Sequence, residues 1–206
     1  MIVVTGATGT IGSELISLLS EEGADVRAIS RHPPGESEFP GVEWIAADLA
    51  HRSELERVFS GADRLFLLTG NVEHMVGLQK NAIAAAEAAG IEHVVKLSAL
   101  GASDHSNSVI GVWHYIVEQQ LREADVEWTI LRPHVFMQNL LQQVPTIRET
   151  RKIYSPAADA EIPMVDTRDV AAVAAAVLTG RGHVGKRYTI TGPDALSYRR
   201  AADILS

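Results

Sequence analysis

The sequence predicts an α/β protein with a doubly wound parallel sheet, and three observations support this fold class. Apolar segments rich in β-branched residues alternate with helical segments over residues 1–133. The segment at 63–68 is almost entirely apolar, as expected of a parallel strand that is buried on both faces. The first strand runs into a glycine-rich loop that opens a helix, which is typical of this class.

The elements follow one another in a regular order. Strands are expected at 1–4, 24–30, 42–47, 63–68, 91–97 and 126–131, and helices at 10–20, 53–59, 73–89 and 111–124. Beyond Pro133 the pattern predicts helices at 136–147, 168–178 and 197–206, and short strands at 152–154 and 187–191. A polar loop is expected at 32–38, and Asp166 or Thr167 is the expected cap of the helix at 168–178.

Composition and charge exclude several classes of function. The 206 residues include no cysteine, which excludes disulfide bonds, thiolate catalysis and cysteine zinc sites, and we expect no metal site. The net charge of −8, without a block of Lys or Arg, argues against a nucleic-acid-binding surface. No apolar run is long enough to cross a bilayer, and no signal peptide is apparent. We therefore expect a cytoplasmic protein that does not bind membranes.

The glycine-rich loop has glycine at every third position, at Gly6, Gly9 and Gly12. This spacing between a strand and a helix is the dinucleotide-binding fingerprint. Gly6 allows the tight turn, Gly9 lets the backbone approach a pyrophosphate, and Gly12 lets the helix pack closely on the strand. The free N–H groups of the first helical turn attract phosphate charge. The residues expected to bind the dinucleotide here are Gly6, Thr8, Gly9, Thr10, Ile11 and Gly12.

The end of the second strand predicts which nicotinamide cofactor binds. An acid at this position binds the ribose 2′-hydroxyl of NADH, but the sequence has Ser30, Arg31 and His32 instead. Arg31 can bind a 2′-phosphate through two parallel hydrogen bonds, with donors added by its two neighbours. The alternative is a solvated surface arginine. The sequence therefore predicts NADPH, with NADH as the less favoured cofactor.

Two further loops on the same edge of the sheet are expected to contact the cofactor. Asp48 and Leu49 end the third strand, where the carboxylate can accept a hydrogen bond from the adenine amino group or cap the next helix. Thr69, Gly70 and Asn71 follow the fourth strand, where the glycine either leaves space beside a ribose or serves an ordinary turn.

Candidate catalytic residues lie after the fifth strand. Ser98 ends that strand where the nicotinamide is expected, and its hydroxyl either donates to a substrate oxygen or bonds to nearby backbone. His114 and Glu118 lie one helical turn apart, as in a proton-donating imidazole oriented by a carboxylate or in a surface ion pair. Tyr115 is a third candidate, but Gln119 occupies the position at which a short-chain dehydrogenase has lysine.

An acceptor site is expected where the sixth strand ends. Pro133 lies at the edge of the sheet beside the cofactor, and Phe136 with Met137 can form an apolar wall for a flat ring. Asn139 or His134 can donate to the carbonyl oxygen of that ring. The alternative is that Phe136 and Met137 form the buried face of a helix. Lys96 interrupts an apolar strand and can pair with an acid on a neighbouring helix.

These motifs together resemble the NmrA-like family of atypical short-chain dehydrogenases/reductases. The resemblance rests on the glycine pattern, Ser98, and the run Trp-Thr-Ile-Leu-Arg-Pro at 128–133 followed by Phe-Met-Gln-Asn at 136–139. The segments 191–193 and 195–197 are similar to a later strand and helix of the family. The resemblance implies a Rossmann domain at 1–135, NADP(H), and a small substrate lobe. We expect residues 136–206 to complete the sheet and form part of that lobe.

The resemblance also implies two alternative functions. His114 with Glu118 is similar to the His/Glu pair of the branch that reduces quinones and triphenylmethane dyes. On this interpretation the chain transfers hydride from NADPH to a quinone or a related conjugated acceptor. Since the active-site lysine of some relatives is missing, alcohol–ketone chemistry is not expected. The alternative is a non-catalytic regulator that senses NADP(H) and acts through a protein partner, and a homodimer is compatible with either function.

Overall fold

The computed structural model describes residues 1–35, 37–155, 157 and 159–205. Glu36 in the predicted polar loop and Ser206 at the end of the last predicted helix lie outside the described residues. In the described part, seven strands form one sheet in the order β3-β2-β1-β4-β5-β6-β7, and every strand pairing is parallel. The strands are β1 (Ile2–Val4), β2 (Val26–Ser30), β3 (Val42–Ala46), β4 (Arg64–Leu67), β5 (His93–Leu97), β6 (Glu127–Pro133) and β7 (Lys186–Ile190). The predicted fold class is confirmed.

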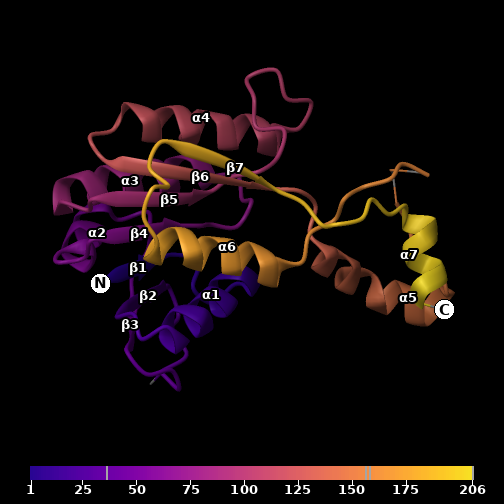
Figure 1. The fold of residues 1–206 in the computed structure, drawn as a ribbon, viewed down its shortest axis with the longest axis horizontal. Coiled ribbons are helices and arrows are strands. Elements are labelled where there is room, and N and C mark those ends of the chain that lie inside the picture. Colours follow the sequence, from indigo (N-terminus) through magenta and orange to yellow (C-terminus); the bar gives the residue numbers. More distant parts are fainter. Residues whose placement is uncertain (36, 156, 158, 206) are drawn as a thin grey trace.

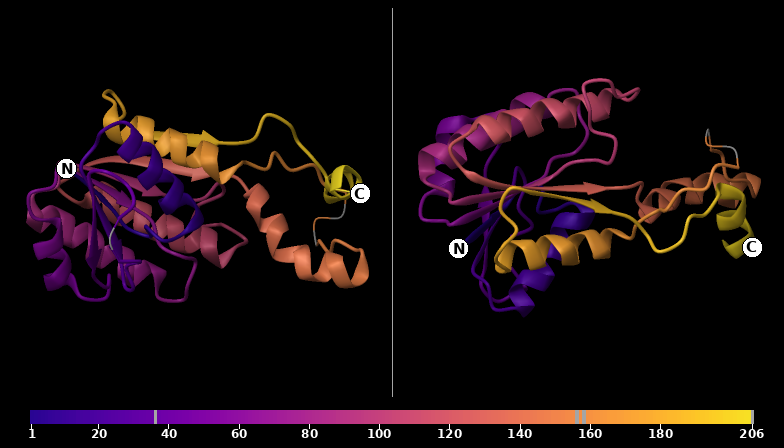
Figure 2. Two further views of the ribbon diagram at one scale, coloured as in Figure 1. Left: turned by 90° about the horizontal axis from the view of Figure 1, so that it is seen from below. Right: turned by 45° about the horizontal axis from the view of Figure 1, so that its top comes forward.

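Helices cover both faces of the sheet, as Figures 1 and 2 show. One face carries α1 (Thr10–Glu21) and α6 (Thr167–Thr179). The other face carries α2 (Arg52–Phe59), α3 (Met75–Ala89) and α4 (Val109–Glu123). Successive residues of each strand point to opposite faces, so two apolar cores form. Val95 packs with α1 and α6, for example, whereas its neighbour Val94 packs with α3 and α4.

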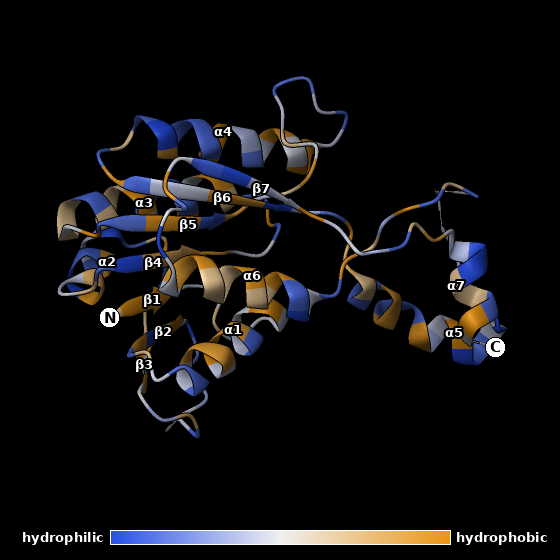
Figure 3. Cartoon of the chain, viewed as in Figure 1, coloured by the Kyte–Doolittle hydropathy of each residue, from blue (hydrophilic) through white to orange (hydrophobic). Residues whose placement is uncertain are grey.

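The central strands are buried. In Figure 3, β1 is coloured as hydrophobic, whereas the helices also carry hydrophilic residues. All three residues of β1 are buried, as are Leu65, Phe66 and Leu67 of β4. The strand order reverses between β1 and β4, so the loops that follow these two strands turn away in different directions. In open α/β sheets, ligands bind in the crevice that forms at this reversal, outside the carboxyl ends of the strands.

A small lobe projects beyond the carboxyl end of the sheet (Figures 1 and 2). It contains the 3₁₀ helix η1 (Met137–Gln143), the helix α5 (Val144–Thr150) and the helix α7 (Tyr198–Leu205). The helix predicted at 136–147 therefore begins as a 3₁₀ helix and continues to Thr150. The strand predicted at 152–154 is wrong, because the Gln143 side-chain amide binds both the N–H and the carbonyl of Tyr154, each at 2.9 Å.

Candidate active site

The glycine loop between β1 and α1 has no room for side chains at two of its glycines. Gly6 adopts a φ of +64°, and a Cβ there would lie 2.9 Å from the Leu68 carbonyl oxygen. A Cβ on Gly12 would lie 2.2 Å from the Gly6 carbonyl oxygen. Gly12 thus allows the helix to pack against the backbone of the loop itself, whereas we expected contact with the strand. The tight loop places Gly9 as the N-cap of α1, so the free N–H groups of the first helical turn lie beside the loop.

Thr5 fixes the position of the neighbouring strand end. Its buried hydroxyl donates to the Leu68 carbonyl and accepts from the Leu68 N–H, both at 2.9 Å. These bonds hold Leu68, and with it the start of the loop after β4, against the glycine loop. Thr5 is not among the site residues predicted from the motifs. The signal that could have found it is a hydroxyl in an otherwise apolar strand, directly before the glycine pattern.

A cavity of ≈ 930 Å³ lies at the carboxyl edge of the sheet, beside the glycine loop. It brings together residues from the loops that follow β1, β2, β3 and β4 and from the start of the lobe. Many of the predicted site residues line it, namely Gly6, Thr8, Gly9, Thr10, Ile11, Arg31, Asp48, Leu49, Thr69, Gly70, Phe136 and Asn139. The two predicted neighbours of Arg31, Ser30 and His32, line it as well.

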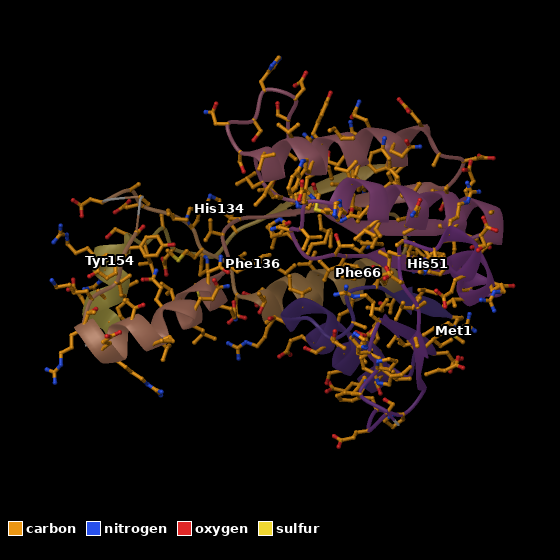
Figure 4. The ribbon with its side chains drawn as sticks, turned by 180° about the vertical axis from the view of Figure 1, so that it is seen from behind. Met1, His51, Phe66, His134, Phe136 and Tyr154 are labelled. Carbon is orange, nitrogen blue, oxygen red and sulfur yellow. The ribbon has the colours of Figure 1, made fainter. Side chains whose placement is uncertain are left out.

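The other predicted site residues do not line this cavity. They are Gly12, Asn71, Ser98, His114, Tyr115, Pro133 and His134. Asn71 is exposed, and the Pro133 carbonyl accepts a hydrogen bond from the Leu100 N–H at 2.9 Å. Figure 4 shows His134 and Phe136 close to the point where the lobe leaves the sheet. Phe136 is half-buried and packs against the core under α1 and α6, so its predicted alternative role as a packing residue also has support.

Asp48 and Arg31 differ in how firmly the structure holds them. One carboxylate oxygen of Asp48 accepts from the Ala50 N–H at 2.9 Å, which closes a short turn after β3. The N-cap of α2 is His51, so the prediction that Asp48 caps this helix is wrong. Arg31 is exposed on the cavity wall, and Ser30 accepts from the His32 N–H at 3.2 Å. The guanidinium is therefore available to an anion in the cavity.

Several residues that line the cavity were not predicted as site residues, and Gln138 and Thr167 are the two that the structure anchors best. The Gln138 amide donates to Asp166 at 2.8 Å and accepts from the Thr167 N–H at 3.1 Å, which joins η1 to the start of α6. Asp166 caps α6 as predicted, by accepting from the Arg168 N–H at 2.8 Å. Hydrogen bonds from Arg168 hold the pKa of the Asp166 carboxyl well below its usual range. The long return path of the chain, which no local motif encodes, brings these residues together.

A buried polar cluster lies under the other half of the carboxyl edge, between α4 and strands β5 and β6. We call it the Lys96 cluster, and it consists of Lys96, Ser98, His114, Glu118 and Arg132. The Glu118 carboxylate is fully buried and accepts from the Ser98 hydroxyl at 2.5 Å. Arg132 binds the same carboxylate through Nε at 2.8 Å and Nη2 at 2.5 Å.

The cluster corrects two predictions. His114 does not pair with Glu118 but with Lys96, whose Nζ lies 3.1 Å from His114 Nδ1. Because both His114 and Glu118 are buried, the alternative of a surface ion pair is wrong too. The Ser98 hydroxyl donates its hydrogen bond to Glu118, so it donates neither to backbone nor, in this arrangement, to a substrate oxygen.

Burial also changes which protonation states the cluster holds. Burial, together with the nearby Lys96 and Arg132 charges, lowers the pKa of His114 to about 3. Burial lowers the pKa of Lys96 to about 7, although Glu118 opposes this shift. His114 is therefore a neutral imidazole near neutral pH, and the protonated imidazole expected from the sequence is not populated there. Any proton that it offers is the one on its free ring nitrogen.

Comparison with known proteins gives matches that span the chain. The model of the NmrA-like family matches residues 1–206. An NAD(P)H azoreductase of Xenophilus azovorans is 38% identical over 208 residues, which cover 100% of this chain and 73% of the relative.

Two solved structures match as well. The NADPH-dependent quinone oxidoreductase of Escherichia coli, complexed with NADPH, has a TM-score of 0.91 at 30% identity, covering 100% of this chain and 74% of that one. The triphenylmethane reductase of Citrobacter sp., complexed with NADP(H), has a TM-score of 0.90 at 25% identity, covering 100% and 75%. These relatives support the predicted NADPH-dependent reductase, and the resemblance drawn from the motifs is confirmed: the chain belongs to the NmrA-like family.

Proposed function

We propose that this chain binds NADPH in the cavity over the glycine loop and reduces a quinone or a related conjugated acceptor. The observation that carries the proposal is the cavity itself. It is continuous from Arg31, through the glycine loop, to Phe136 and Asn139 at the base of the lobe. Relatives that are named as an azoreductase and a quinone oxidoreductase support this class of reaction.

The lining residues suit each part of NADPH. The glycine loop and the first turn of α1 would hold the pyrophosphate, because backbone N–H groups and the helix dipole favour negative charge there. Arg31, with His32 beside it, would bind the 2′-phosphate through charge-assisted hydrogen bonds. Asp48 would lie near the adenine and Thr69 near the ribose, since both line the cavity. When bound, NADPH would supply the hydride, and the chain would hold the cofactor in a fixed orientation beside the acceptor.

Apolar residues at the same edge support a flat, conjugated acceptor. Several large hydrophobic side chains are exposed after β4, β5 and β6 rather than buried, namely Val72, Leu100, Val109, Val135 and Leu141. All five follow the carboxyl ends of strands, and ligands bind outside this edge in open α/β sheets. Phe136 adds an aromatic face on the cavity wall. An aromatic acceptor that stacks here would be held close to the cofactor without requiring a charged anchor.

The catalytic demand on the protein is small in this reaction. Reduction of a quinone needs a hydride and a proton on the carbonyl oxygen, and the chain lacks the tyrosine–lysine pair of alcohol dehydrogenases of this fold. We propose that the neutral His114 ring donates a hydrogen bond to the acceptor oxygen, while the proton that this oxygen takes up comes from water. His114→Ala is then expected to lower kcat by about 100-fold, with the affinity for NADPH little changed.

Turnover with a panel of quinones tests the proposal directly. NADPH absorbance is followed with benzoquinones, naphthoquinones and an azo dye, and equilibrium binding of NADPH is measured in parallel. Quinone-dependent loss of absorbance is the expected result. Tight binding of NADPH without oxidation by any acceptor would overturn the proposal and favour the nucleotide-sensing regulator.

A further inference from the structure

Lys96 is a fully buried lysine in the middle of the sheet. In the strand register it lies between Leu67 of β4 and Ile130 of β6, on the face of β5 that α3 and α4 cover. Its apolar neighbours on that face include Val94 and Val117. Burying an ammonium group is costly unless its hydrogens find partners, so this residue requires an explanation.

The partners of Lys96 are both uncharged. Its Nζ donates to the Leu97 carbonyl at 3.1 Å and lies 3.1 Å from His114 Nδ1. Within the described ranges, no carboxylate lies within ion-pair distance of Lys96. The nearby Glu118 is instead bound by Ser98 and Arg132. Lys96 therefore does not neutralise a buried acid, and its one side-chain partner is the His114 ring.

The Lys96 contact determines which ring nitrogen of His114 carries the proton. An ammonium group has three donors and no acceptor, so Nδ1 must present a lone pair to it. The neutral ring then carries its hydrogen on Nε2. Among the described residues, His114 Nε2 has no hydrogen-bond partner. The only fully buried side-chain nitrogen or oxygen atom without a partner in this part of the chain is Gln79 Oε1, so Nε2 is not fully buried. His114 Nε2 therefore retains some contact with solvent, although His114 does not line the cavity.

We propose that Lys96 is a positioning residue that holds His114 as the neutral tautomer protonated on Nε2, so that Nε2–H donates to the oxygen of the hydride acceptor. The acceptor part rests on the proposed function, whereas the tautomer does not. The charged groups that face His114 are Lys96 from β5, Glu118 from α4 and Arg132 from β6. The low pKa of His114, about 3, keeps the ring neutral in this setting.

Nitrogen-15 NMR of the whole chain with labelled histidine tests the tautomer without any cofactor. At pH 6, where Lys96 is protonated, His114 is expected as a neutral ring with hydrogen on Nε2, assigned through the signals that His114→Gln removes. A protonated ring, or hydrogen on Nδ1, would overturn the proposal. The tautomer is read in the wild-type chain, and His114→Gln serves only to assign the His114 signals.

Lys96→Met tests the cause. Methionine fills a similar volume without a donor, so the His114 ring should populate both tautomers and its pKa should rise towards 6.5, its ordinary value. Val94→Ala, on the same face of β5, is the matched control and should leave the His114 signals unchanged. Unchanged His114 signals in Lys96→Met would show that Lys96 does not set the tautomer.

Kinetics then connect the tautomer to the reaction. Lys96→Met is expected to lower kcat with a quinone by about 10-fold, with an unchanged KM for NADPH, whereas Val94→Ala keeps its kcat. A rise in the KM for NADPH with kcat intact would contradict the positioning role. If the wild-type chain turns over no quinone, the proposed function fails, but the NMR result still decides whether Lys96 controls His114.

Discussion

Two halves of the same sheet edge are built in opposite ways. The half over β1–β4 is an open cavity of ≈ 930 Å³, lined by loop backbone and by exposed side chains such as Arg31. The half over β5 and β6 is closed, and the side chains of the Lys96 cluster beneath it bind one another, apart from His114 Nε2. The open half can accept a charged ligand, whereas the closed half offers a ligand little beyond His114 Nε2. On the proposed function, the open half would bind the cofactor and the closed half would contribute the hydrogen bond to the acceptor.

The largest expected effect is a loss of stability when the buried ion pair of the closed half is removed. Glu118→Gln leaves the Arg132 guanidinium without its carboxylate in a buried site, and removing one member of a buried ion pair costs about 3–5 kcal/mol. Arg122→Met is the matched control, since Arg122 lies 3.7 Å from the same carboxylate but its side chain is 34% exposed. That control should cost less than about 1 kcal/mol. Urea unfolding of both variants measures the difference, and equal losses would contradict the account.

The open half has its own sensitive point in the glycine loop. Gly12→Ala places a Cβ 2.2 Å from the Gly6 carbonyl oxygen, so the loop must shift, at an expected cost of about 1–3 kcal/mol and with weaker NADPH binding. Gly77→Ala is the control, because no atom lies near its Cβ and alanine favours the α3 helix. Titration with NADPH, together with thermal unfolding, should separate the two, and unchanged NADPH binding in Gly12→Ala would contradict the role of the loop.

The two halves also differ in how far the sequence predicts them. The glycine loop, Arg31 and Asp48 each follow a strand directly, and the carboxyl ends of parallel strands meet at one edge of the sheet. Their positions in the sequence are therefore enough to place them together. The spacing of His114 and Glu118 correctly places both on one face of α4, but that face turns inward. On that inward face, His114 pairs with Lys96 of β5 and Glu118 pairs with Arg132 of β6, so the two helical residues do not pair with each other. Local spacing does not encode such competition, because it depends on strand register and on burial.

Lowering the pH should reduce the free energy of unfolding through the buried His114 of the closed half. The His114 ring titrates near 6.5 when unfolded and near 3 in the fold, so between these pH values the unfolded chain binds the extra proton. The free energy of unfolding then falls as the pH falls, by about 1.6 kcal/mol from pH 6.5 to 5, and the slope approaches about 1.4 kcal/mol per pH unit once the unfolded ring is mostly protonated. Urea unfolding at both pH values measures the loss, and His114→Gln should remove this part of it. A slope that is the same in both proteins would be inconsistent with a buried neutral His114.

The smallest expected effect lies at the rim of the open half. Arg31→Ala removes the guanidinium that would bind the 2′-phosphate, so NADPH affinity should fall by about 10-fold while NADH affinity stays the same. Arg52→Ala, a surface arginine that does not line the cavity, is the control. Isothermal titration with both cofactors measures the preference. Equal affinities of the wild-type chain for NADPH and NADH would show that Arg31 does not select the cofactor.

Single-turnover kinetics at saturating NADPH most directly test the division of labour between the two halves. The chain is loaded with NADPH and mixed with a quinone, and the loss of NADPH absorbance is followed in the wild type, Arg31→Ala and His114→Ala. At saturation, Arg31→Ala should match the wild type, because only binding was weakened, whereas His114→Ala should remain about 100-fold slower. Bound NADPH that persists in the wild type, or a wild-type rate in His114→Ala, would contradict the account.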